Sequence, residues 1–308
     1  MIEAYYLIAL GFGATAALGL AASWIDRKVT ARLQYRVGPP LLQPLTDLVK
    51  LMGKETTVPS TATRPVFFAA PLTGLSAVMV ASAVVWAANA NPQSGFVGDW
   101  IVLIYLLVMP SLAMIAAGFA SGNPVASLGA SREMKLVLSY ELPFVLAFLV
   151  PVIHSPDNAI RLGALVEMQS KSGAVAGSLS GLLALLVVIL VTQAKLALVP
   201  FDIPEAETEL AEGPLIEYSG PLLGTFRLMR NMMLFLLPFV AVTLFWGGAS
   251  LSGWGFLWAF LKVVALVAVT TVIRNTNPRV RIDQAMRFFW GPVTVLAAAS
   301  VVLALAGA

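Results

Sequence analysis

The chain consists mostly of long apolar runs separated by short polar segments. Eight runs reach the roughly 20 residues that an α-helix needs to cross about 30 Å of hydrocarbon. They cover residues 3–25, 65–88, 99–120, 130–153, 177–200, 222–247, 252–275 and 287–306. The pattern therefore predicts an all-α integral membrane protein with eight transmembrane helices. The first run continues into the charged sequence WIDRK without an A-x-A-type cleavage site, which predicts a retained helix.

The segment after the first run has a different, amphipathic pattern. Apolar residues recur there at helical spacing: Leu41, Leu42, Leu45, Leu48, Val49 and Met52. Asp47, Lys50 and Lys54 lie largely on the opposite side. Residues 41–54 are therefore predicted to form a short helix in the membrane interface. A simple peripheral anchor with solvated charges is the alternative.

Composition agrees with a membrane protein and limits the chemistry that this chain can carry. Of 308 residues, 59% are hydrophobic and 11% charged, and the mean hydropathy is +0.87. No repeat or long linker divides the sequence, which predicts a single transmembrane domain over 1–308. The absence of Cys and the single residue His154 exclude cysteinyl iron-sulfur clusters and thiolate zinc sites within the chain. No metal is expected here, and no basic patch with interleaved aromatics indicates nucleic-acid binding.

Positive charge predicts the orientation, because Lys and Arg beside membrane spans are retained in the cytoplasm. Apart from Arg161, Lys171 and Lys262, every Lys and Arg lies in or beside the segments that follow the first, third, fifth and seventh runs. These segments are predicted to face the cytoplasm, with both termini outside. The expected location is the cytoplasmic membrane, in contact with the lipid bilayer.

An acidic loop is predicted on the cytoplasmic side between the fifth and sixth runs. The sequence PFDIPEAETELAEGPLIEYSG, residues 200–220, contains six of the sixteen acids and no Lys or Arg. The acids are Asp202, Glu205, Glu207, Glu209, Glu212 and Glu217. Helix-start chemistry predicts a short helix over 204–212 that is capped by Asp202 and closed by Gly213-Pro214. Its apolar flanks favour a segment tucked against the membrane, where crowded carboxylates without cations would share protons.

Three further charged residues lie within apolar runs. Glu141 is two turns or more inside the fourth run, and such a carboxylate typically marks a proton or ion path. A neutral Glu that is hydrogen-bonded to a neighbouring helix is the alternative. Lys262 lies near the middle of the seventh run and is a second candidate for the path, whereas Lys195 is close enough to the cytoplasmic end to reach water.

Three cytoplasmic stretches resemble a known family. RKVTARLQYRVGP with LLQPLTDLVKLMGKE, SLGASREMKLVLSYE and the acidic loop are similar to the family shared by membrane subunit 1 of respiratory complex I and the energy-converting membrane-bound [NiFe]-hydrogenases, formate hydrogenlyase included. Two features resemble the hydrogenase branch. Gly38-Pro39-Pro40 runs directly into Leu41 without the insertion usual in complex I, and the loop ends in EGPLIEYSG.

The resemblance implies a subunit without redox chemistry of its own. It would anchor a peripheral redox arm and couple electron transfer to proton or sodium translocation as part of an ion-translocating oxidoreductase. Glu141 and the loop acids would form the proton path. Arm docking, or the lining of a quinone cavity, would fall to charged residues near the cytoplasmic ends: Arg27, Arg32, Arg36, Asp47, Lys50, Arg132 and Glu133.

The hydrogenase branch is the first functional hypothesis. The implied partners are hydrogenase large and small subunits, a ferredoxin-like iron-sulfur subunit and antiporter-like membrane subunits, with the [NiFe] centre and the iron-sulfur clusters on those partners. The alternative is the quinone-site membrane subunit of complex I, in which quinone would bind. A stand-alone secondary transporter is a third hypothesis, and a purely structural anchor remains open.

Overall fold

The computed structural model describes residues 6–93, 95–155, 159–250 and 253–307, with backbone only for 6–8, 207 and 208. All regular structure in this described part is helical, as the sequence predicts. Seven helices are long and apolar enough to cross a membrane: Ala9–Leu33, Arg64–Ala90 (α4), Asp99–Ala120 (α5), Pro124–His154 (α6), Gly220–Phe245 (α10), Trp254–Thr276 (α11) and Ile282–Leu305. The first comprises η1 (Tyr6–Ala14) and α2 (Thr15–Leu33), and the last comprises α12 (Ile282–Phe288), η5 (Phe289–Val293) and α13 (Thr294–Leu305).

The fifth predicted span differs from the other seven. Its helix, α8, covers only Leu179–Lys195, which is 17 residues, or about 26 Å at 1.5 Å per residue. The Ser178 hydroxyl caps its start by accepting a hydrogen bond from the Gly181 amide. After Lys195 the chain turns, and Ala197 adopts a positive φ of 48°. The apolar run 177–200 therefore overstates the length of the helix, and eight full spans are not confirmed.

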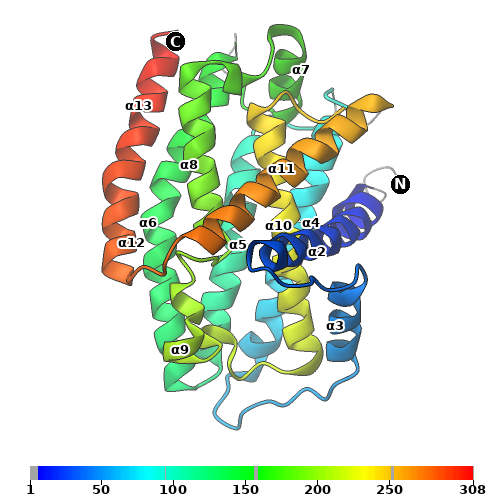
Figure 1. The fold of residues 1–308 in the computed structure, drawn as a ribbon, viewed down its shortest axis with the longest axis vertical. Helices are drawn as coiled ribbons and strands as arrows, with labels where there is room; N and C mark the ends of the chain where they lie inside the picture. Colours follow the sequence, from blue (N-terminus) through cyan, green and yellow to red (C-terminus); the bar gives the residue numbers. More distant parts are fainter. Residues whose placement is uncertain (1–5, 94, 156–158, 251–252, 308) are drawn as a thin grey trace.

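Helix α10 forms the centre of the bundle. It packs against α2, α4, α11 and α8, and almost all its residues from Met232 to Phe245 are buried. Figure 1 shows α11 running obliquely across the bundle. α3 and α9 lie at one end, while α7 (Leu162–Ser172) lies at the other. The cytoplasmic segments of the sequence prediction thus gather at one end of the molecule.

The predicted amphipathic helix is present as α3, Gln43–Met52. Its apolar stripe is partly exposed, with Leu45, Val49 and Met52 all open to the surroundings. α3 packs against α2 and α10. An exposed apolar stripe on a helix that also contacts the bundle fits the predicted place in the membrane interface.

The acidic segment forms three short turns, and the single helix predicted over 204–212 is wrong. They are η3 (Ile203–Glu205), α9 (Glu207–Leu210) and η4 (Gly213–Leu215). Asp202 makes no side-chain cap, because its carboxylate instead binds Arg279.

Close backbone packing holds this segment against α6. At Gly129 an added Cβ would lie 2.7 Å from Cδ of Pro214 and 2.9 Å from the carbonyl oxygen of Pro204. Gly213 has a φ of +55°, and a Cβ there would collide with the same Pro204 oxygen. The two glycines therefore allow the segment to approach α6 and fold back on itself.

Candidate functional site

The carboxylates of the acidic segment have partners that the sequence did not reveal. Four form ion pairs and one accepts a hydrogen bond: Asp202 with Arg279 at 2.8 Å, Glu205 with Arg230, Glu209 with Arg132 at 2.6 Å, Glu212 with Arg227 at 3.1 Å, and Glu217 with Asn123 at 2.5 Å. The expectation of crowded acids without cations is therefore wrong for these five. The side chain of Glu207 lies outside the described residues.

Only two of these acids turn toward the interior. The side chains of Asp202 and Glu205 are 13% and 17% exposed, compared with 60% for Glu209 and 50% for Glu212. Burial raises the pKa of Asp202 above its usual range, although the Arg279 guanidinium acts in the opposite direction. Glu209 and Glu212 instead form exposed pairs at the surface, so the segment has an inner and an outer set of carboxyls.

A cavity of about 490 Å³ opens beside the segment, between α2, α3, α10 and the end of α11. Arg27 and Asp47 lie in its wall and form an ion pair of 2.7 Å that joins α2 to α3. The Arg27 guanidinium lowers the pKa of Asp47. Lys50 also lines the cavity, so three of the residues predicted for a docking or quinone-like cavity meet there.

Other predicted docking residues do not join this cavity. Arg32 and Arg36 are exposed near the end of α2 and are not among its lining residues. Arg132 reaches Glu209 at the surface. Glu133, the next residue along α6, is only 2% exposed and lies in the interior. Its burial does not fit the docking surface on which the sequence placed it.

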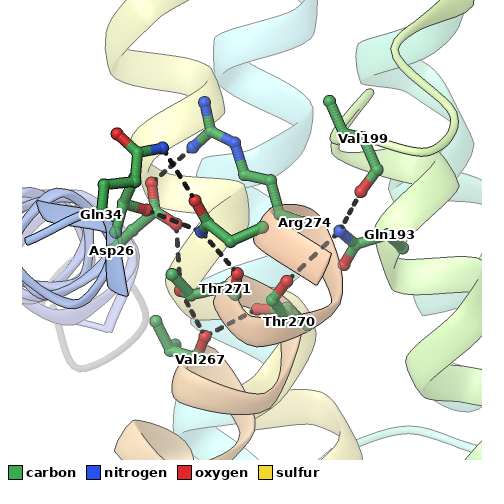
Figure 2. A network of polar contacts seen from close by, with 10 residues as sticks. Asp26, Gln34, Gln193, Val199, Val267, Thr270, Thr271 and Arg274 are labelled. Atoms are coloured by element: carbon green, nitrogen blue, oxygen red, sulfur yellow. Dashed lines mark hydrogen bonds and ion pairs between the residues drawn. The ribbon is translucent and has the colours of Figure 1, made fainter. Parts of the chain in front are cut away.

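A polar network joins the cavity to the start of the acidic segment (Figure 2). Asp26, which lines the cavity, accepts hydrogen bonds from Arg274 at 2.7 Å and Thr271 at 2.9 Å on α11. On the other side of α11, Gln193 of α8 donates to the carbonyl oxygens of Thr270 at 3.3 Å and Val199 at 2.6 Å. One turn of α11 therefore lies between the cavity wall and the chain that leads into the acidic segment.

Lys195 and Glu141 form an ion pair of 2.9 Å inside the bundle. The Lys195 side chain is 1% exposed, and its ammonium nitrogen lies 4.4 Å from the centroid of the Phe144 ring. The expectation that Lys195 reaches water is therefore wrong. Oε1 of Glu141 is buried and has no hydrogen-bond partner within the described residues.

Buried polar groups connect this pair to Arg230. A small cavity of about 20 Å³ is lined by Glu133, Lys195, Ser111 and Arg230. Arg230 also lines the 490 Å³ cavity and a third cavity of about 110 Å³ beside Glu205. The arrangement thus leads from the large cavity through Arg230 and Glu205 to Glu133, and then to Lys195 and Glu141.

Glu141 marks the far end of this line. It contributes to the wall of an open groove of about 940 Å³ between α4, α5 and α6, whose other walls are mostly apolar, Ile101 and Val145 among them. A buried carboxylate that reaches a lateral groove offers a route for protons between the interior and a neighbouring molecule.

Lys262 does not belong to this line. Its ammonium group donates a hydrogen bond of 2.6 Å to the carbonyl oxygen of Trp246, the C-cap residue of α10. It therefore satisfies the end of a helix at the opposite end of the bundle from the acidic segment.

The sequence analysis did not include Lys195 or Arg230 among the site residues. Both are basic residues within apolar runs, which was a usable signal. Their closeness to the predicted cytoplasmic ends favoured a simple reach to water, and only the packing of α8 and α10 shows that they point inward.

Comparisons with known proteins agree on one family. The NADH dehydrogenase family matches residues 5–305. A membrane-complex relative from Geobacillus thermodenitrificans, a subunit of its NADH-quinone oxidoreductase, is 33% identical over 96% of this chain and 90% of the relative. The subunit of the same name from Syntrophotalea carbinolica is 35% identical, over 92% and 90%, and subunit 8 of the Thermus thermophilus enzyme is 32% identical, over 94% and 84%.

A solved structure shares the fold over the full length. A chain of the membrane-bound sulfane sulfur reductase, an archaeal respiratory membrane complex, has a TM-score of 0.88 and 27% identity. The match covers 99% of this chain and 100% of the other. The relatives and this neighbour are thus subunits of respiratory oxidoreductase complexes.

Proposed function

Because the chain belongs to the NADH dehydrogenase subunit 1 family, we propose that it is the arm-anchoring and proton-coupling membrane subunit of an NADH-quinone oxidoreductase-type complex. The observation that carries this proposal is the buried line of charged residues between the 490 Å³ cavity and Glu141. A stable anchor alone would not need it, because burying unmatched charges costs free energy.

The large cavity fits the head group of a quinone as a substrate. Its wall combines leucine side chains, such as Leu48 and Leu234, with the Arg27–Asp47 pair, which offers hydrogen-bonding groups to a carbonyl oxygen. The first-loop charges and the exposed pairs of Glu209 and Glu212 would face the peripheral arm. Electrons would reach the quinone from iron-sulfur clusters on partner subunits, since this chain has no Cys to bind one.

Charge in the cavity would act on the interior through Arg230. A reduced quinone carries negative charge until it is protonated, and Arg230 lies in the cavity wall while it binds Glu205. Competition for this guanidinium would weaken its hold on Glu205, which then takes up a proton more readily. Glu133, Lys195 and Glu141 would pass the proton to the lateral groove. We place an antiporter-like membrane subunit at that groove.

The arrangement in the membrane is part of the same proposal. The end with α3 and α9 would face the cytoplasm, with both termini outside, and α8 with its following turn would provide the eighth crossing. Whether protons or sodium ions move through the partner subunits does not change the roles given to these residues.

A hydrogenase complex is the second candidate function. It would keep the same interior residues, but a [NiFe] centre on a partner would replace the quinone. None of the relatives described above is named as a hydrogenase, so we place the quinone-linked function first. The full-length match to the sulfane sulfur reductase favours keeping a second candidate, because that complex is named for another acceptor. A stand-alone transporter has no support from relatives that are complex subunits.

Filling the cavity tests the quinone-linked function. In the purified complex, Leu48→Trp should raise the KM for a short-chain quinone at least several-fold. Reduction of a soluble dye by the peripheral arm should stay unchanged. Leu261→Trp, at a 47% exposed position on α11, is the control for added bulk. An unchanged quinone KM in Leu48→Trp, with hydrogen evolution by the same preparation, would reject the first candidate and favour the second.

A further inference from the structure

The interior line contains an unequal number of acids and cations. Among the described residues it includes three carboxyls, Glu133, Glu141 and Glu205, but only two cations, Lys195 and Arg230. Arg230 is paired with Glu205, and Lys195 with Glu141. Glu133 is left over, and its Oε2 atom is buried without a hydrogen-bond partner. Three ionised carboxylates beside two cations would be costly there, which indicates that one carboxyl holds a proton.

The groups that face Glu133 define what it can exchange with. The Ser111 hydroxyl of α5 is hydrogen-bonded to it, and its charge would also interact with Glu205, Arg230 and Lys195. Ser111 in turn lies 3.1 Å from the hydroxyl oxygen of Tyr140, whose ring is 4.9 Å from the ammonium nitrogen of Lys195. Lys195 is therefore the nearest flexible cation that could serve both Glu133 and Glu141.

The surroundings of Lys195 allow its ammonium group to move. The small cavity shared by Glu133 and Lys195 has a volume of about 20 Å³, enough for about one water molecule. The ammonium group is of similar size, and it sits on a flexible four-carbon stem. Glu133 and Glu141 are eight residues apart on α6, so they lie on the same side of that helix, with Tyr140 between them.

We propose that Lys195 moves between Glu141 and Glu133, and that a single proton occupies whichever of these two carboxyls the ammonium group has left. In the arrangement seen here, Lys195 binds ionised Glu141 and Glu133 is protonated. When Lys195 moves to Glu133, the O–H bond of Glu133 breaks and one forms on Glu141. One cation, one anion and one neutral acid are present before and after, so no uncompensated charge is created in the interior.

This exchange would act as a gate in the proton path. A proton reaches the groove only when Lys195 has left Glu141, and at that moment Glu133 is ionised and cannot hold a second proton for return. The meaning of the gate rests on the proposed function, whereas the exchange itself can be measured without turnover.

Infrared difference spectra of the assembled complex test the exchange, because a protonated carboxyl has its own carbonyl stretching band. Glu133→Gln should remove one such band. Glu141→Gln should remove the same band, since Lys195 then moves to Glu133 and ionises it. Lys195→Met should produce two bands in place of one. The control is Glu167→Gln, whose exposed carboxyl binds Lys171 at 2.7 Å on α7 and should leave these bands unchanged.

Each outcome decides something. A Glu133 band that persists unchanged in Glu141→Gln, or its absence in the wild type, would overturn the exchange. If the bands change as expected but Glu133→Gln translocates protons normally, the exchange of Lys195 is confirmed and the proposed proton path is rejected.

Discussion

Asp26 and Arg274, which are 248 positions apart in the chain, form an ion pair of 2.7 Å where α2 meets α11. The Asp26 side chain is 9% exposed, and Arg274 keeps about a third of its side chain in contact with the surroundings. Thr271 adds a second hydrogen bond to the same carboxylate. This pair fixes the end of α11 next to both the large cavity and Gln193.

Replacing Asp26 with Asn should therefore destabilise the α2–α11 contact. The amide can still accept from Thr271, but Arg274 loses its counter-charge, and we expect a cost of about 2 kcal/mol. The midpoint of thermal unfolding of the purified complex is the measurement. The control is Asp283→Asn, because Asp283 lies 3.7 Å from Arg281 in an exposed pair that contributes little. Equal midpoints for the two variants would contradict the structural role of Asp26.

Glu205→Gln and Glu141→Gln should separate electron transfer from proton translocation. Both variants keep the size of the side chain, so the complex should assemble, but neither amide can carry the proton. We expect proton translocation to slow by on the order of 100-fold. Glu207→Gln belongs in the same series, because its role remains a prediction from the sequence.

The measurement for this series is the number of protons moved per electron in proteoliposomes that contain the complex. Asp283→Asn again serves as the control on the same side of the molecule, since its pair with Arg281 is exposed. Wild-type stoichiometry in both Glu205→Gln and Glu141→Gln would remove these residues from the path.

Gly213→Ala should release the acidic segment from α6. The added Cβ would meet the carbonyl oxygen of Pro204 at a positive φ, and we expect a loss of more than about 3 kcal/mol. Gly173→Ala is a matched control, because Gly173 has a φ of +94° but open space around it. Its cost should be only about 1–2 kcal/mol. Limited proteolysis at residues 200–220 would show the difference, and equal cleavage of the two variants would contradict it.

Two carboxyls on the cytoplasmic-end segments should respond to pH in opposite directions. Burial raises the pKa of Asp202 above its usual 3.8, so its contribution to stability is present below pH 3.8 and is lost as the pH rises through the folded pKa. The Arg27 guanidinium lowers the pKa of Asp47 below 3.8, so its contribution is present above pH 3.8 and is lost as the pH falls.

Hydrogen exchange at a series of pH values, corrected for the intrinsic rate, measures both effects. Protection near Asp202 should fall as the pH rises from about 4 to 7. It should stay level in Asp202→Asn. Protection in α3 should fall below pH 4 in the wild type but not in Asp47→Asn. Parallel changes in the two segments would contradict the assignment.

Apolar periodicity predicted most of the fold, because a helix in lipid must satisfy its own backbone and expose apolar side chains. It failed at α8, where the run 177–200 continues beyond the helix. The apolar residues after Lys195, Leu196 and Leu198 among them, pack into the protein core and therefore look like membrane residues in the sequence.

The ion pairs of the candidate site were beyond the reach of sequence reasoning. Arg132 and Glu209 are 77 positions apart, so a search for nearby cations could not pair them. Arg132 and Glu133 were treated as one surface group. Successive helical residues point about 100° apart, however, and this rotation sends Arg132 outward and Glu133 into the interior. Which side of α6 faces the bundle is decided by packing.

The close seating of Pro204 and Pro214 on Gly129 separates two tasks that the acidic segment could have combined. Shape alone keeps it docked, so its ionisable groups need not serve as fasteners. Their protonation can change during each reaction cycle while the surrounding architecture stays still.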